Sequence, residues 1–393
     1  MKRLLVVGAS ILQLPAIKKA KEMGFWVGTV DYNPQAIGVS YADEFREVST
    51  IDEKGVCNAA KEFGIDGIIT LATDMPMRSV AYTAECLGLN GITYETAIKA
   101  TDKGEMIKAF QAADVEHPWY IILQNPAQLS DVEEKIKFPC ISKPLDNAGS
   151  RGVVLIKSKD ELEGAVHYSS RNGRKGGVII EEYLQGREVS VEAIVINNNV
   201  YTIQVTDKLT NGAPYFVEMG HSQPSSLSKS DVRDIKKLAL RAIKSIGINT
   251  GPVHVEIMLT EKGPRMIELG ARMGGDCIAT HLIPLSTGVD MVRATIELAL
   301  GELPDITPRF DKGAAVRYLD EESGCIKSVL GIRDAQQING VQEVVITKGA
   351  GDIIGEINSS NERIGFVIAQ GINAEAAISC CKDALNRITV NME

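Results

Sequence analysis

The sequence lacks a long apolar run. No stretch approaches the roughly 20 apolar residues that a membrane-spanning helix needs, so we expect no membrane segment. The short apolar run at residues 4–7 is not followed by a small-residue cleavage site, which predicts a strand rather than a signal peptide. We therefore expect the protein in the cytoplasm.

The sequence also lacks a disulfide or zinc pattern. Its seven cysteines are scattered and odd in number, and they form no CxxC pair and no Cys/His spacing typical of zinc. Cys380 and Cys381 are neighbours in a predicted helix at residues 375–387, where packing explains them. We therefore expect a reduced protein without structural disulfides.

An excess of positive charge is missing as well. The 42 basic and 51 acidic residues give a net charge of −9, which argues against a general binder of nucleic acid or of anionic membranes. A local basic pocket for a small charged molecule remains compatible with this charge. At 393 residues, 44% of them apolar and 24% charged, the chain has the composition of a soluble globular protein with two or three domains.

The first hundred residues alternate between strand and helix patterns. Continuous apolar strands separated by helices predict a parallel sheet that is covered on both faces. The loops that follow such strands lie where sheets of this kind bind ligands. The expected strands are 4–7, 26–30 and 67–71, and the expected helices are 14–23, 51–63 and, beyond the sheet, 95–113.

A dinucleotide site is the least supported function for this sheet. Asp31 follows the second strand about where a ribose-binding acid would lie. However, Gly8 is a single glycine where the G-x-G-x-x-G fingerprint needs three. An NAD-dependent oxidoreductase is therefore the weakest of the alternatives.

A lysine and a glycine-rich turn stand out in the middle of the chain. A short strand at 138–143 delivers Lys143, and a turn with Gly149 and Gly152 leads to a second strand at 153–155. Glycines let backbone N–H groups approach a ligand closely, and a run of such groups beside a lysine forms an anion cradle. Taken alone, the stretch is equally compatible with an ordinary hairpin that carries a solvated lysine.

Two glutamates mark a second predicted hairpin, with strands at 253–259 and 265–269. Glu256 and Glu268 lie in these largely apolar strands, and carboxylates are rarely buried without a partner cation or a metal. Hard oxygen ligands suit Mg²⁺ that bridges nucleotide phosphates. The alternative is that one side of the hairpin faces solvent and both acids are surface residues.

With Lys103, Glu181, Glu188 and Arg272, these stretches resemble the ATP-grasp superfamily in order and spacing. The match is with its carboxylate–amine ligase branch, which is similar to L-amino acid ligases, biotin carboxylase and carbamoyl-phosphate synthetase. The resemblance covers essentially the whole chain and implies a mixed α/β and α+β fold. It also implies that the protein is soluble and forms a homodimer. The implied parts are a Rossmann-like amino-terminal domain at 1–100, an ATP-grasp domain at 101–310 with a small lid at about 114–185, and a carboxy-terminal α+β domain at 311–393.

The resemblance implies an ATP site assembled from many short segments. Glu188 would accept hydrogen bonds from the ribose hydroxyls, and Lys208 would contact the γ-phosphate. The residues implied to hold the phosphates are Lys103, Lys143, Asp146, Gly149, Ser150 and Gly152, and those implied to read the adenine are Glu181, Glu182 and Leu184.

The metal and substrate roles follow from the same resemblance. Glu256 and Glu268 would hold one or two Mg²⁺ ions, with Mn²⁺ as a substitute, and Arg272 would face the substrate carboxylate. The usual motif is Glu-x-Asn-x-Arg, but here Gly270 replaces the asparagine, which removes one expected oxygen ligand. His221 is either a contact or base for the second substrate, or a loop histidine satisfied by the backbone.

The implied reaction joins a small carboxylate, such as an amino acid, to an amine. ATP would convert the carboxylate into an acyl phosphate, and the amine would then displace phosphate, so that ADP and phosphate are released. The alternative is an enzyme of the carboxylase or carbamoyl-phosphate type that uses bicarbonate, although the chain shows no biotin carrier and no glutamine-amidotransferase segment. A nucleotide-binding protein without catalysis is a third class, and the retained lysines and acids argue against it.

Overall fold

The computed structural model describes residues 1–321 and 323–393. The amino-terminal sheet is parallel and has the order β3 (Glu44–Glu47), β2 (Trp26–Asp31), β1 (Arg3–Val7) and β4 (Gly67–Ile69). Side chains of a strand alternate between faces. Leu4 and Val6 therefore pack on one face and Leu5 and Val7 on the other. The first face is covered by α1 (Leu14–Glu22) and α9 (Met291–Ala299), and the second by α2 (Glu53–Phe63) and α3 (Met77–Leu87).

This sheet confirms the predicted α/β class, but its acid does not fit a dinucleotide site. One carboxylate oxygen of Asp31 accepts a hydrogen bond from Ala9 N at 2.8 Å, and the other accepts one from Asn33 N at 3.0 Å. Asp31 thus stabilises the turns that follow β1 and β2. Both of its oxygens are used by the backbone, which speaks against a ribose-binding role.

The single helix predicted at 95–113 is wrong, because the segment forms two helices. These are α4 (Tyr94–Thr101) and α5 (Lys103–Ala112), separated by an extended residue, Asp102. The Asp102 carboxylate accepts hydrogen bonds from Gly104 N at 3.0 Å and Glu105 N at 3.1 Å. An aspartate in this position caps a helix strongly. The cap makes Lys103 the first residue of α5.

A second, antiparallel sheet packs against α6 (Lys159–Asn172) in the segment predicted to be a lid, and we keep the name lid for this unit. Buried apolar residues of the strands, such as Val178 and Ile180, meet Leu162 and Val166 of the helix. Its strands have the order β5 (Tyr120–Leu123), β8 (Val178–Glu182), β6 (Cys140–Pro144) and β7 (Val154–Ile156), with the 3-10 turns η2 (Pro126–Asp131) and η3 (Glu133–Lys135) beside them. The predicted hairpin around Lys143 is therefore an antiparallel pair, β6 with β7, joined by residues 145–153, which we call the glycine loop.

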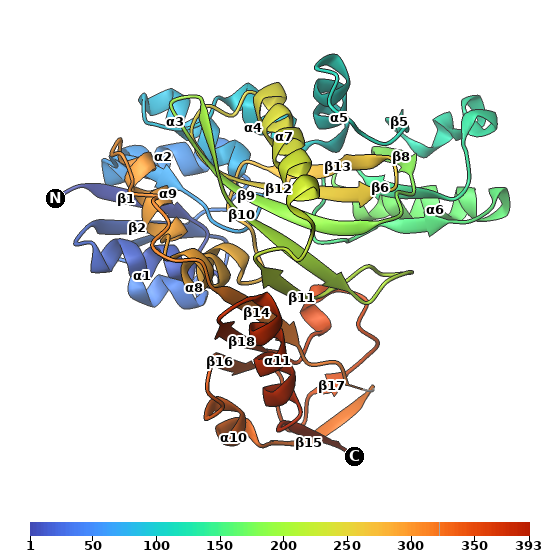
Figure 1. The fold of residues 1–393 in the computed structure, drawn as a ribbon. Helices are drawn as coiled ribbons and strands as arrows, with labels where there is room; N and C mark the ends of the chain where they lie inside the picture. The colour runs from blue at the N-terminus through green and yellow to red at the C-terminus, as the bar shows by residue number, and fades with distance from the viewer. Residues whose placement is uncertain (322) are drawn as a thin grey trace.

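The central sheet is antiparallel and connects the rest of the molecule (Figure 1). On one face, α7 (Lys229–Ile246), α4 and α5 cover a core that includes Val191, Val255 and Ile243. The strand order is β13 (Gly263–Gly270), β12 (Gly251–Thr260), β9 (Arg187–Ile196), β10 (Asn199–Thr210), β11 (Glu218–Gln223), β14 (Gly313–Tyr318), β18 (Gly365–Gly371) and β16 (Val341–Ile346). The predicted hairpin is β12 with β13, and its register sets Glu256 directly opposite Glu268.

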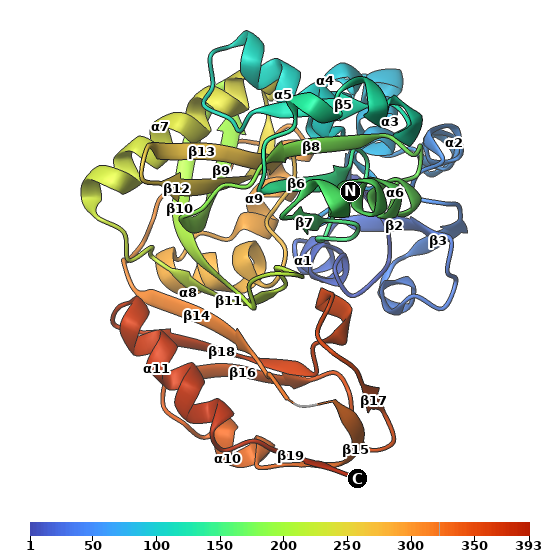
Figure 2. The same ribbon diagram turned by 90° about the vertical axis from the view of Figure 1, so that its right-hand side faces the viewer.

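Three strands of the carboxy-terminal segment extend this sheet, and three others form a small sheet of their own. β14 pairs with β11, so that β14, β18 and β16 continue the central sheet toward the carboxy terminus (Figure 2). The predicted domain boundary at residue 311 stays a prediction. The remaining elements are η4 (Ile278–Leu282), α8 (Ile283–Thr287), α10 (Ile332–Gln336), η5 (Ser360–Glu362), α11 (Ala374–Leu385), η1 (Ile37–Tyr41) and the small sheet of β17 (Ile353–Ile354), β15 (Gly324–Leu330) and β19 (Thr389–Met392).

The cysteine pair of α11 and the apolar character of the helices were both addressed by the sequence. Cys381 of α11 is buried with Val367 and Ala377 in the core of this segment, as packing requires. Within residues 1–321 and 323–393, no helix has the length and apolar character needed to cross a membrane.

The chain passes from the lid into the central sheet through residues 183–186, which we call the hinge. A Cβ atom on Gly186 would overlap the Leu259 carbonyl oxygen of β12. We expect Gly186→Ala to push the hinge away from β12 and to lower the free energy of unfolding by about 1–3 kcal/mol, the range for overpacking. Urea unfolding measures this difference.

Gly164→Ala is the matched control for this prediction. Gly164 is exposed in α6, and no atom lies within 4 Å of its Cβ position. Alanine favours a helix over glycine, so this change should raise the free energy of unfolding by up to about 1 kcal/mol. Equal midpoints for the two variants would contradict the close approach at the hinge.

Candidate active site

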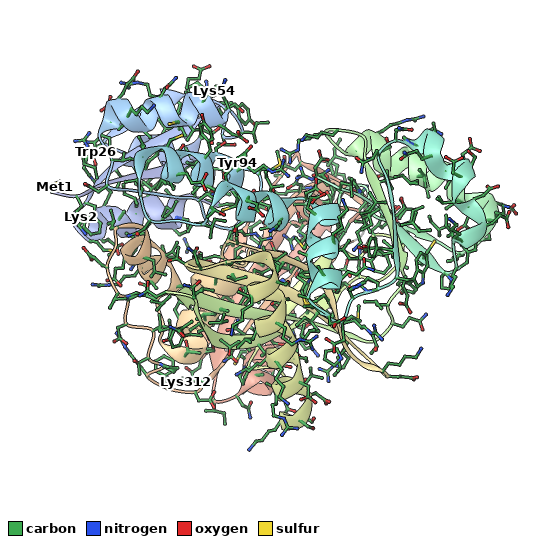
Figure 3. All side chains as sticks on the ribbon, turned by 90° about the horizontal axis from the view of Figure 1, so that it is seen from above. Met1, Lys2, Trp26, Lys54, Tyr94 and Lys312 are labelled. Carbon is green, nitrogen blue, oxygen red and sulfur yellow. The ribbon has the colours of Figure 1, made fainter. Side chains whose placement is uncertain are left out.

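Two adjoining cavities open between the lid and the central sheet. The amino-terminal sheet, which carries Trp26, and the lid lie on opposite sides of the molecule when it is seen from above (Figure 3). The first cavity lies beneath the glycine loop and against the hinge, and the second lies toward the amino-terminal sheet and η4. The residues that line both cavities are Ala148, Gly149, Ser150, Arg151, Lys208, Glu218, Glu256 and Glu268. The two cavities are therefore compartments of one cleft.

The hinge end of the first cavity is apolar. Tyr183 and Phe216 bring their ring centroids to 6.1 Å, and Leu184 lies beside them. Such a slot suits a flat aromatic group. Of the backbone groups predicted to read adenine, the Glu182 N–H already donates to the Trp119 carbonyl oxygen at 3.0 Å, which leaves its carbonyl available. The other apolar residues of the slot are Ile141, Val153, Met258, Met266 and Ile267.

Lys143 and Glu181 form a buried ion pair in the first cavity. Lys143 Nζ lies 2.5 Å from Glu181 Oε2, and the two side chains are only 11% and 6% exposed. Burial alone would lower the pKa of the Lys143 ammonium, but Glu181 and Glu268 outweigh that effect and raise it. The lysine is therefore charged and faces the same space as the glycine loop.

Lys103 joins the glycine loop to the glutamate hairpin. Its Nζ lies 3.0 Å from Glu268 Oε2 and donates to the Asn147 carbonyl oxygen at 2.8 Å. The cap at Asp102 fixes this lysine at the start of α5, from which it reaches both partners. A movement of the glycine loop therefore changes the surroundings of Lys103.

Lys208 is surrounded by three carboxylates. Its Nζ lies 2.5 Å from Glu188 Oε1, 3.3 Å from Glu256 Oε2 and 3.5 Å from Glu218 Oε1, and its side chain is 3% exposed. Burial alone would lower the pKa of this ammonium, but the three carboxylates raise it well above its usual range. Desolvation raises the pKa of Glu188 in spite of its contact with Lys208. The cluster keeps a fixed positive charge on the wall shared by both cavities.

The opposed acids of β12 and β13 fit a magnesium site. Burial alone would raise the pKa of Glu256, but Lys208 and His254 hold it well below its usual range, so this carboxylate is ionised. His254 Nε2 lies 3.1 Å from Glu256 Oε1, and His254 Nδ1 lies 2.7 Å from Glu192 Oε1. No cluster of three or more His, Cys, Asp or Glu able to hold a metal occurs in the described part of the chain. Mg²⁺ suits such a pair because it takes few carboxylates and completes its shell with phosphates and water.

Arg272 lies at the carboxyl end of β13 and pairs with Asp74, which follows β4. Arg272 Nε donates to Asp74 Oδ1 at 3.0 Å, and Nη2 donates to Oδ2 at 2.9 Å. Burial alone would lower the pKa of Arg272, but Asp74 raises it, so the guanidinium stays charged. Both residues line the second cavity. The pair links the amino-terminal sheet to the central sheet.

His221 is buried in the wall of the second cavity. It is 1% exposed, and neither ring nitrogen has a hydrogen-bond partner among the described residues. Its Nε2 lies 3.7 Å from Asp276 Oδ2, beyond hydrogen-bonding distance. Asp276 is held instead by Arg363, with distances of 2.8 and 2.9 Å to its two oxygens. The histidine is therefore not satisfied by the backbone, the alternative that the sequence left open.

Two predicted phosphate contacts do not line the cleft. The Asp146 carboxylate accepts hydrogen bonds from Arg174 N at 2.9 Å and Lys175 N at 3.2 Å, so it anchors the end of α6. Gly152 has a φ of +81°, and a Cβ there would lie 2.7 Å from Pro144 Cγ. Both residues shape the glycine loop. Gly149 and Ser150 do line the cleft, and they stay predicted phosphate contacts.

The structure adds four charged residues that sequence reasoning did not assign. Glu218 lines both cavities, and Asp74 and Asp276 line the second. Arg363 reaches Asp276 from the far end of the chain. A usable signal for Glu218 was its position three residues before His221, the candidate base, on the same strand. Asp74 lies in the loop after the strand expected at 67–71, where ligand binding was expected, although no role was assigned to its side chain, and Arg363 gave no signal for a site role.

Comparison with known proteins agrees with this geometry. Residues 136–280 match the model of the ATP-grasp domain, and residues 317–393 match the model of the L-amino acid ligase C-terminal domain 2. An alanine–anticapsin ligase of Bacillus subtilis is 27% identical over 328 residues, which cover 76% of this chain and 68% of the relative. Carnosine synthase 1 of Homo sapiens is 26% identical over 199 residues, 48% of this chain and 24% of the relative.

The fold agrees over the full length. The crystal structure of an L-amino acid ligase from Bacillus licheniformis superimposes with a TM-score of 0.87 and 22% identity, covering 100% of this chain and 99% of that one. Both family models agree with the cleft between lid and central sheet and with the opposed glutamates, because all of them indicate an ATP-dependent ligase. The chain therefore contains an ATP-grasp domain at residues 136–280 and an L-amino acid ligase C-terminal domain 2 at residues 317–393, and it is similar to carboxylate–amine ligases.

Proposed function

We propose that the protein activates a small carboxylate, an amino acid in the first instance, as an acyl phosphate and joins it to an amine. The observation that carries this proposal is the shared wall of the two cavities, which contains Lys208, Glu218, Glu256 and Glu268. A nucleotide in the first cavity and a carboxylate in the second would meet at this wall. Relatives named as an alanine–anticapsin ligase and an L-amino acid ligase support an amino acid as the carboxylate.

ATP fits the first cavity in one orientation. Its adenine would occupy the apolar slot between Tyr183 and Phe216, and its phosphates would face the opposite, polar end. Lys103 and Lys143 would neutralise the phosphates there, and the glycine loop would cover them with backbone N–H groups. Glu188 would accept the ribose hydroxyls from the middle of the cavity.

Magnesium would be held by Glu256 and Glu268, with Glu218 close by. When bound, it would supply charge neutralisation between the carboxylates of the protein and the phosphates of the nucleotide. Gly270 offers no side-chain oxygen, so the protein contributes carboxylates only. One bound ion or two would satisfy this arrangement.

The first step is the attack of the substrate carboxylate on the γ-phosphoryl group. Arg272 would hold the carboxylate in the second cavity, and the buried Lys208 would face the phosphoryl group during transfer. Positioned charges of this kind supply most of the catalysis in phosphoryl transfer. The glycine loop would exclude water, because an acyl phosphate hydrolyses when water reaches it.

The second step is the attack of the amine on the acyl phosphate. The amine nitrogen forms the C–N bond, the C–O bond to phosphate breaks, and one proton must leave the nitrogen. His221 is suited to accept that proton, because it is buried in the wall of the second cavity without a hydrogen-bond partner. Asp276 lies close enough to stabilise the imidazolium that forms.

A product screen tests this function. The purified chain is incubated with ATP and Mg²⁺ and with single amino acids, amino acid pairs, other small carboxylates with an amine, or bicarbonate. We expect ADP release that requires a carboxylate and an amine together, and a product whose mass equals both substrates less one water. ADP release with bicarbonate alone would favour a carboxylase, and the absence of release in every arm would overturn the proposal.

Lys143→Ala is expected to lower the rate of ADP release by roughly 10² or more, the scale for losing one electrostatic stabiliser. The change removes a cation from the phosphate end of the first cavity and leaves Glu181 buried without its partner. Initial rates at saturating ATP measure the effect. Lys157→Ala is the control, since this lysine is exposed beyond β7. A near-normal rate for Lys143→Ala would remove Lys143 from the site.

A further inference from the structure

Gly270 is a glycine for reasons of space. Its φ lies outside the left-handed region, so the backbone would accept other residues. A Cβ at this position, however, would lie 2.6 Å from Asp74 Oδ1 and 3.0 Å from Arg272 Nε. A side chain at this position requires the Asp74 carboxylate to shift, which disturbs its hydrogen bond to Arg272 Nε. The missing side chain therefore makes room for the ion pair.

The ion pair fixes which edge of Arg272 faces the cavity. A guanidinium has five N–H groups. Asp74 takes one on Nε and one on Nη2, and the Met273 carbonyl oxygen accepts a third from Nη1 at 3.1 Å. Hydrogen bonds among the described residues leave two N–H groups, one on each terminal nitrogen. Two such donors at the end of the guanidinium match the two oxygens of a carboxylate or a phosphoryl group.

Without Asp74, other acids would compete for this guanidinium. Glu256 and Glu268 are near enough to favour its charged form, and both lie on the same hairpin. If Arg272 turned toward them, it would neutralise the proposed magnesium ligands and withdraw from the second cavity. Asp74 comes from the opposite side, after β4, and holds Arg272 away from the hairpin acids.

We propose that Asp74 is a positioning residue for Arg272, and that Gly270 is the residue that makes its approach possible. Asp74 clamps the Nε edge of the guanidinium and leaves the end of the guanidinium for the substrate. The substrate role of Arg272 rests on the proposed function, whereas the coupling between positions 74 and 270 does not.

A double-mutant cycle in thermal stability tests the coupling without any substrate. We expect Gly270→Ala to lower the Tm by about 3 °C or more in the natural chain, because the new Cβ displaces the carboxylate. In the Asp74→Ala background the same change should cost less than half as much, because the space is then open. An equal loss of Tm in both backgrounds would overturn the coupling.

Gly275→Ala is the matched control for the cycle. The nearest atoms to its Cβ position belong to Ala72 and lie 3.8 Å away, and its φ is likewise outside the left-handed region. This change should give the same small shift in both backgrounds. A background-dependent shift at Gly275 as large as that at Gly270 would show a general loosening and overturn the specific pairing.

Kinetics test the positioning role with the carboxylate that gives the largest ADP release in the screen. Asp74→Asn should raise the KM for that carboxylate at least 10-fold while the KM for ATP changes less than 2-fold, because the nucleotide lies in the other cavity. Gly270→Ala should raise the same KM, and the double variant should not add to it. An unchanged KM for the carboxylate, or equal losses for both substrates, would overturn the role. If no carboxylate releases ADP, the proposed function fails, and the stability cycle still decides the coupling.

Discussion

Lys208→Met is expected to lower the rate of ADP release by roughly 10³ or more, beyond the effect of any other lysine in the cleft. Removal of one preorganised donor costs about 10²–10³ in rate. The effect of losing Lys208 should lie at the upper end of this range of rates, because its side chain is 3% exposed on the wall shared by both cavities. Its charge would therefore act on the transferring phosphoryl group with little screening. Single-turnover quench-flow measurement of ADP at saturating ATP gives the chemical rate directly.

The same change should also weaken the fold. Loss of the ammonium leaves Glu188, Glu218 and Glu256 close together without their shared cation. Removing one partner of a buried ion pair typically costs about 3–5 kcal/mol. The double variant Lys208→Met/Glu218→Gln separates the two effects, because it restores the charge balance of the cluster without restoring the lysine. We expect recovery of part of the stability and none of the rate. A double variant with near-natural activity would show that Lys208 only balances charge.

The fold could be predicted where hydrophobic periodicity and turn chemistry agree. The helix expected at 51–63 forms at Glu53–Phe63, between an N-cap at Asp52 and Gly64, which has a φ of +59°. The glutamate hairpin likewise forms with the expected facing acids. The prediction of a single helix at 95–113 was wrong because the apolar pattern continues through Asp102, whose side chain caps the second helix. One capping hydrogen-bond pattern there outweighed helical periodicity.

The site could be predicted in part, for a physical reason. The order and spacing of the motifs resembled the ATP-grasp superfamily, and this resemblance implied a common site for Lys143, Glu188, Lys208, Glu256 and Glu268, which all line the first cavity. The second cavity is built differently. It draws acids and bases from chain segments that meet only in three dimensions, such as Asp74 with Arg272, 198 positions apart. No periodicity encodes such a contact. Even Gly270 appeared only as a lost ligand until the structure showed which carboxylate fills its space.

Glu268→Gln and Glu256→Gln are expected to raise the Mg²⁺ concentration for half-maximal ADP release by at least 10–100-fold. Mutation of a residue that contacts a metal ligand typically lowers metal affinity or activity about 10–100-fold. Loss of a ligand itself should have at least this effect. An amide keeps the size of the side chain and removes the negative charge that Mg²⁺ needs. Glu256→Gln should have the larger effect on stability as well, because its carboxylate also contacts Lys208 and His254.

The control variant changes a glutamate on the same hairpin, so that it differs from the two cleft variants only in the position of the lost charge. Glu261→Gln removes one charge from the exposed turn between β12 and β13 and should leave the Mg²⁺ requirement unchanged. Binding of Mn²⁺ in the presence of ADP, followed by electron paramagnetic resonance, reports on the site without turnover. Weaker Mn²⁺ binding in both cleft variants, with normal binding in Glu261→Gln, would support two carboxylates as metal ligands. If the cleft variants bound Mn²⁺ normally and kept the natural Mg²⁺ requirement, the opposed acids would serve only to pair with Lys103 and Lys208, and the metal would have to be held elsewhere.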